Sequence, residues 1–147
     1  MEPIDLFSLT DDAAPAGRRR IVAPGGQSGP ATEGRTMEGQ YRCAAGYLLL
    51  LTENSPYDEG LHILLLGPDC RLRDQIQIGT TYNPGILTEQ AVEGETLAFS
   101  MFGHRWRLRV HETARHWPGL ATPRGARRPL GRLLARRHLE LQRSPDS

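Results

Sequence analysis

Short β-type segments follow one another through the middle of this chain, and their succession limits the possible folds more than any other feature. We expect strands near 41–52, 60–67, 71–78, 85–92, 96–102 and 105–112. Clusters of Gly, Pro, Asn and Asp separate them, and no long stretch with a helical period lies between them. The pattern predicts a mainly β fold with about six strands, an antiparallel meander forming a small barrel or a two-layer sandwich.

Two of these segments are apolar on both faces. They contain "YLLLL" at 47–51 and "LHILLL" at 61–66, where no polar residue alternates regularly with the apolar ones. Strands of this kind are central in a sheet or lie under a covering element. The C-terminal segment is one candidate for that cover.

The flanks of the β region differ from it in composition. Residues 1–36 contain many breakers, as in "APGGQSGPATEG", which predicts a disordered N-terminal extension. The all-β domain is expected at 37–113, and one hypothesis takes Met37 as the natural start of the chain. Residues 114–147 are expected to form a basic linker, with a short amphipathic helix near 130–141 as an option, because four leucines there share a helical face.

Charge divides unevenly along the chain, although its total is only +1. The balance is −1 over residues 1–36, −4 over 37–113 and +6 over 114–147. All 18 basic residues are arginine. Because lysine is absent, a phosphate-loop lysine and a Schiff-base lysine are both excluded.

Three arginines alternate with apolar residues in "RWRLRV" at 105–110. With a two-residue turn at Gly103 and His104, Met101 would face Trp106 in the core, and Arg105, Arg107 and Arg109 would point outward. This row is either the solvated face of a strand or a binding surface. The opposite strand offers no acid there, although Glu89, one strand further over, could reach Arg109.

Two other groups are candidate contact residues. Tyr57 and Tyr82 lie in loops rich in Pro and Gly, where exposed aromatic residues often serve recognition. Arg132, Arg136 and Arg137 in the basic tail could contact nucleic acid or another anion in a salt-sensitive manner.

Catalytic motifs are absent, and one pair of residues is the only weak candidate for catalysis. With a three-residue turn at 67–69, His62 would lie opposite Asp74, and a buried His–Asp pair could act as a general base. With a two-residue turn the pair disappears, and Asp74 is then a structural hydrogen-bond acceptor. A small enzyme using these two residues is therefore an alternative rather than the leading interpretation.

No metal site or cofactor is expected. His104, His111 and His116 are close in sequence, but on a strand the first two point to opposite faces. Cys43 and Cys70 fit neither a redox motif nor a zinc framework, so we expect two reduced, partly buried thiols.

The sequence thus favours a non-enzymatic β-domain that binds a protein or small-molecule partner of unknown identity. Nucleic-acid or anion binding through the arginine-rich tail is the second hypothesis. The chain has no apolar run long enough for a membrane span and begins without a secretory signal, so we expect it in the cytoplasm. The sequence does not indicate the oligomeric state.

Overall fold

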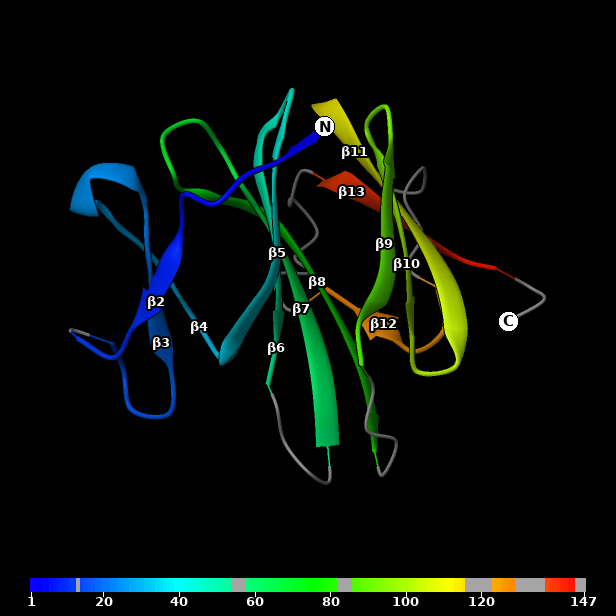
Figure 1. Cartoon of the computed structure of the whole chain (residues 1–147), viewed down its shortest axis with the longest axis horizontal. Helices are drawn as coiled ribbons and strands as arrows, with labels where there is room; N and C mark the ends of the chain where they lie inside the picture. Colours follow the sequence, from blue (N-terminus) through cyan, green and yellow to red (C-terminus); the bar gives the residue numbers. More distant parts are fainter. Residues whose placement is uncertain (13, 54–57, 82–85, 116–122, 129–136, 145–147) are drawn as a thin grey trace.

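The computed structural model of this chain is built almost entirely from antiparallel strands in three sheets (Figure 1). It describes residues 1–12, 14–53, 58–81, 86–115, 123–128 and 137–144. Within these ranges the only helical segment is a short 3-10 turn at Pro24–Gly26, and no sheet closes into a barrel. The prediction of a mainly β, antiparallel fold is confirmed, with three stacked sheets in place of a barrel or two layers.

The largest sheet lies in the middle of the molecule (Figure 1). Its strands are β1 (Glu2–Pro3), β5 (Thr36–Cys43), β6 (Gly46–Thr52), β7 (Asp58–Leu66), β8 (Leu72–Thr81) and β12 (Ala126–Arg127). They are ordered β1-β5-β6-β7-β8-β12, so a meander of β5 to β8 forms the centre and a two-residue strand lies at each edge. The later half of the predicted meander, from 85 to 112, belongs to a separate sheet. The single strand expected at 41–52 is a hairpin, because the chain turns at Ala44 and Ala45.

Strands β6 and β7 are buried on both faces, as their apolar sequences predict. On one face lie leucines such as Leu48 and Leu65, and on the other lie Leu49 and Leu64, all at most 1% exposed. The two sets belong to two separate core clusters. The central sheet is therefore covered on each side by a different outer sheet.

A four-stranded sheet covers the first face. It contains β9 (Thr88–Glu93), β10 (Thr96–Met101), β11 (His104–Arg115) and β13 (Arg137–Arg143), in the order β13-β11-β10-β9. Its inward side chains include Phe99, Trp106 and Leu139. The C-terminal helix suggested near 130–141 is not seen. Residues 137–143 form β13, and residues 130–136 lie outside the described residues.

A three-stranded sheet from the N-terminal segment covers the second face. It is formed by β2 (Ser8–Thr10), β3 (Arg19–Val22) and β4 (Ser28–Thr32). Phe7, Ile21 and Ala23 are buried against the leucines of β6 and β7. This corrects the expectation of a disordered extension over residues 1–36. Few apolar residues are needed, because the buried leucines of β6 and β7 supply most of the apolar surface of this cluster.

The N-terminus is also anchored. The Met1 ammonium donates a hydrogen bond to the Gly94 carbonyl at 2.9 Å and lies 2.8 Å from Glu95 Oε2. The Ala44 N–H donates to Glu95 Oε1 at 2.7 Å. Burial raises the pKa of Glu95, but these two donors outweigh it and hold the pKa below its usual value. The carboxylate thus joins the edge of the central sheet to the turn between β9 and β10.

Candidate functional site

The arginines at 105, 107 and 109 lie on the outer face of the four-stranded sheet. Trp106 and Leu108, which alternate with them, are at most 1% exposed and face the central sheet. The alternation thus places Trp106 on the face opposite the arginines. A surface that combined these arginines with that aromatic ring to stack nucleic-acid bases is therefore ruled out.

The turn before this row differs from the predicted one. The two turn residues are Phe102 and Gly103, both with positive φ of 56° and 74°, and not Gly103 and His104. Positive φ at both central positions is the requirement of a type I′ turn, which matches the twist of the two strands. Phe99 consequently pairs with Trp106, which shifts the predicted register by two residues. A shift by two leaves every side chain on its predicted face, so the outward row survives.

One of the three arginines is neutralised. Arg105 Nη1 lies 3.3 Å from Glu89 Oε2 and donates hydrogen bonds to the Glu89 carbonyl at 3.0 Å and to Ser100 Oγ at 3.1 Å. Glu89 has a positive φ of 54° and lies where the β9–β10 register shifts. The counterion expected for Arg109 thus serves Arg105, because Ser100 pairs with Arg105 on one side and with Thr88, the residue before Glu89, on the other.

The other two arginines are exposed and form no ion pair or side-chain hydrogen bond within the described part of the chain. Arg107 lies between Ala98 on β10 and Gln142 on β13, and both of these neighbours are uncharged. Arg109 lies beside Glu140, but Glu140 Oε1 is directed to His111 Nε2 at 3.0 Å. Both arginines therefore keep their donors available.

The surface around Arg107 and Arg109 is hollowed. A depression of about 280 Å³ is lined by Thr96, Arg107, Arg109, Glu140 and Gln142. These residues come from β10, β11 and β13 and all point away from the core. The depression therefore combines two cationic donors with hydroxyl and amide groups, beside one carboxylate, Glu140, which is directed to His111. Two guanidinium groups against one engaged carboxylate suit an anionic group.

The proposed pairing of His62 with Asp74 does not form. His62 pairs with Gln77 and Asp74 pairs with Leu65, because of the register between β7 and β8. His62 and Leu65 are three residues apart on one strand and thus point to opposite faces. The structure places His62 toward the N-terminal sheet and Asp74 toward the four-stranded sheet, which removes the geometric basis for a His–Asp general base.

Asp74 takes the structural role that was the alternative. Its carboxylate accepts two hydrogen bonds from Arg128 Nη1, at 2.7 and 2.8 Å, and both side chains are at most 7% exposed. The backbone N–H groups of His138 and Leu139 also donate to it, each at 2.9 Å. Arg128 in turn donates to the Leu139 carbonyl. The network ties β8 of the central sheet to β13 of the four-stranded sheet.

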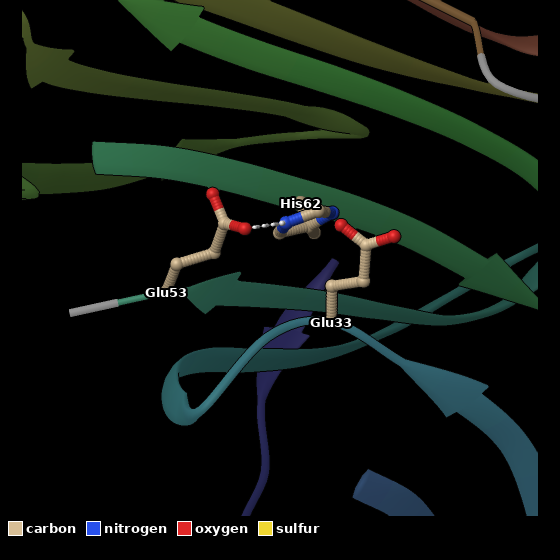
Figure 2. A group of neighbouring side chains, drawn as sticks. All are labelled: Glu33, Glu53 and His62. Carbon is tan, nitrogen blue, oxygen red and sulfur yellow. Dashed lines mark ion pairs between the residues drawn. The ribbon is translucent and has the colours of Figure 1, made fainter. Parts of the chain in front are cut away.

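His62 has a different set of neighbours, shown in Figure 2. Its Nε2 lies 3.7 Å from Glu53 Oε1, and donor atoms of Glu33, Glu53 and His62 all lie within 4.8 Å of one another. Burial lowers the pKa of His62, although Glu53 and Glu33 act in the opposite direction, so the ring is neutral near pH 7. No sequence motif indicated this group, because its members are 20 and 9 residues apart and match no metal-binding spacing.

The remaining histidines and the cysteines form no reactive group among the described residues. His104 makes an edge contact with Trp106, His111 pairs with Glu140, and His138 Nδ1 lies 2.8 Å from the His111 carbonyl oxygen. His116 lies outside the described residues. Cys43 and Cys70 are both free thiols, as expected, and burial raises the pKa of each. A raised pKa keeps a thiol protonated and unreactive at neutral pH.

Several candidate contact residues lie outside the described residues, namely Tyr57, Tyr82, Arg132 and Arg136. Of the tail candidates, Arg137 is described, at the start of β13, where it is half-buried. Tail binding therefore stays a prediction.

Comparison of the chain with protein-family models, with curated proteins and with solved structures gave no match. In the described part of the chain, no helix has the length and apolar character needed to cross a membrane.

Proposed function

We propose that this chain is a non-enzymatic β-domain that binds an anionic group of a protein or small-molecule partner at the outer face of the four-stranded sheet. The observation that carries the proposal is the pair Arg107 and Arg109, which are exposed, form no ion pair with any described residue, and line one depression.

The charge pattern supports an anion rather than an apolar ligand. Arg105 on the same strand forms an ion pair with Glu89. Among the three arginines of the row, only Arg107 and Arg109, which line the depression, form no ion pair with a described residue. A guanidinium presents its N–H donors in a planar fork that matches a carboxylate or a phosphate. Thr96 and Gln142 supply further polar groups on either side of the row.

The expected affinity is modest. The site is open, and an exposed ion pair contributes about 0–1 kcal/mol. Tight binding therefore requires the partner to contact more of the outer face than the two arginines. The affinity should fall as salt rises, because exposed charges are screened beyond about 8–10 Å at physiological ionic strength.

The test is a fluorescence-anisotropy titration of the full chain with two labelled probes, a hexaglutamate peptide and a short single-stranded oligonucleotide, at low and near-physiological salt. The double variant Arg107→Glu/Arg109→Glu should weaken peptide binding at least tenfold, which corresponds to about 1.4 kcal/mol. The matched control is Arg35→Glu/Arg71→Glu, which reverses two exposed arginines elsewhere and should keep near wild-type binding.

Equal loss in both double variants would refute the proposed site, since binding would then depend on net charge alone. Oligonucleotide binding that survives Arg107→Glu/Arg109→Glu but is lost in Arg132→Glu/Arg136→Glu would instead favour the arginine-rich tail and the nucleic-acid alternative.

A further inference from the structure

The imidazole of His62 is buried without a hydrogen-bond partner. Its side chain is 3% exposed, and among the residues that the structure describes neither ring nitrogen has a partner within hydrogen-bond distance. Glu53 Oε1 lies 3.7 Å from His62 Nε2, which is too distant for a hydrogen bond. A buried polar ring left in this state is costly, since most buried side-chain polar atoms have a partner.

Two carboxylates are directed at this ring (Figure 2). Glu53 follows the end of β6, Glu33 follows the end of β4, and His62 is within β7. The three residues thus come from the central sheet and from the N-terminal sheet, and their donor atoms gather within 4.8 Å.

The backbone around the two glutamates is shaped for this approach. A Cβ on Gly60 would lie 2.0 Å from Glu53 Oε2, so the carboxylate occupies space that only glycine leaves open. A Cβ on Gly34 would lie 2.5 Å from Leu51 Cβ, so the segment after β4 can lie directly on β6. The Gly34 N–H also donates to the buried Thr32 Oγ1 at 3.0 Å, which fixes the residues on both sides of Glu33.

We propose that Glu33, Glu53 and His62 bind one divalent transition-metal ion of the zinc type. One neutral imidazole and two carboxylates balance the charge of such an ion, and imidazole is a preferred ligand of this class. Three protein ligands leave the fourth tetrahedral position for water.

The geometry needs only a small adjustment. In a tetrahedral site with bonds of about 2.0–2.2 Å, two ligand atoms lie about 3.4 Å apart. The donor atoms, now within 4.8 Å, would close by up to about 1.4 Å. His62 is held in the sheet, whereas both glutamates have flexible side chains. Arg18 Nη2 lies 3.5 Å from Glu33 Oε1, but this ion pair is half-exposed and competes only weakly with a metal ion for the carboxylate.

The test uses the full chain, treated with EDTA and freed of it, in an isothermal titration with Zn²⁺ and a thermal-unfolding scan with and without Zn²⁺. We expect one ion per chain, a higher unfolding temperature with Zn²⁺, and a visible absorption band of tetrahedral type with Co²⁺. Mg²⁺ and Ca²⁺ prefer all-oxygen ligand sets and should bind at least tenfold more weakly.

Glu33→Gln, Glu53→Gln and His62→Gln should each raise the zinc dissociation constant at least tenfold and abolish the thermal shift. Glu33 is half-exposed, so its variant should remain folded even if the change at buried His62 does not. Gly60→Ala should also weaken binding, because it displaces Glu53 without removing a ligand.

Glu93→Gln and Cys43→Ser are the controls, since they remove an exposed acid and a thiol elsewhere, and both should bind zinc as the wild type does. The proposal is overturned if the wild-type chain binds no zinc at 100-fold excess, if the three ligand variants bind it unchanged, or if Ca²⁺ competes equally.

Discussion

The ion pair between Asp74 and Arg128 is buried, so removing either partner alone is expected to be strongly destabilising. Arg128→Met removes the guanidinium and leaves the carboxylate buried. Asp74→Asn keeps the size of the side chain but leaves the guanidinium without its charge partner. The pair joins two sheets, so either change also weakens their contact.

The magnitude follows from the burial of the two side chains, 7% and 5% exposed. Removing one partner of a buried pair costs about 3–5 kcal/mol, since the remaining charge is desolvated and uncompensated. This loss is a large part of the free energy of unfolding of a typical domain, which is about 5–15 kcal/mol. The double variant Asp74→Asn/Arg128→Met leaves no buried charge. An asparagine oxygen at the position of Asp74 Oδ2 would still accept the two β13 N–H groups.

We therefore expect the double variant to lose less stability than the sum of the single variants, with a coupling energy of about 2–3 kcal/mol. The assay is equilibrium unfolding in urea, followed by circular dichroism and tryptophan fluorescence for all four proteins. A loss below about 1 kcal/mol in Arg128→Met, or strictly additive losses in the double variant, would refute this reasoning.

Three further predictions concern the outer sheets. Ile21→Ala should lower the free energy of unfolding in urea by about 2–5 kcal/mol, because Ile21 is fully buried against the central sheet. Ile86→Ala, at an 80% exposed position, should change this free energy by less than about 0.5 kcal/mol. Gly103→Ala should lower the free energy of unfolding by about 1–2 kcal/mol through its positive φ alone, since nothing beyond its chain neighbours lies within 4 Å of the added Cβ. An unchanged unfolding temperature would contradict the turn. Burial raises the pKa of Glu95, but the Met1 ammonium contributes to a net lowering of this pKa. The carboxylate therefore stabilises the fold at any pH above its unfolded pKa of about 4.3. This stability is lost as the pH falls through the lower pKa of the folded state. The unfolding temperature of Glu95→Gln should thus lie below wild type at pH 7 and approach it near pH 3; a difference independent of pH would count against the ion pair.

Strands β6, β7 and β8 were predictable because each carries its own signal, whereas β5 was not recognised as a separate strand. The alternation of apolar and charged residues predicted correctly which side chains of β11 face the core. The apolar runs of β6 and β7 predicted that both faces of these strands are buried. Turn positions were less accurate. Phe102 and the alanines at 44 and 45 are not typical turn residues, so local preference did not indicate where the chain reverses.

The N-terminal sheet and both polar clusters depend on contacts between distant segments. Residues 1–36 have too few apolar side chains to predict a sheet, and Ile21 is buried only because β6 and β7 provide the surface it meets. Likewise, Arg128 reaches Asp74 across 54 residues of sequence. Glu33 meets His62 only when the N-terminal sheet docks. These contacts join residues far apart in the chain, so no local sequence pattern predicts them.

The double burial of β6 and β7 also has a consequence for biosynthesis. The three strands of the N-terminal sheet leave the ribosome before the leucine-rich strands that they cover, and the four-stranded sheet follows last. At about 5–20 residues per second, one face of the nascent meander can be shielded at once, while the other waits several seconds for β10, β11 and β13. During that interval the exposed leucines are a substrate for chaperones. Synonymous changes that slow translation after β8 should therefore lower the soluble yield without altering the finished protein.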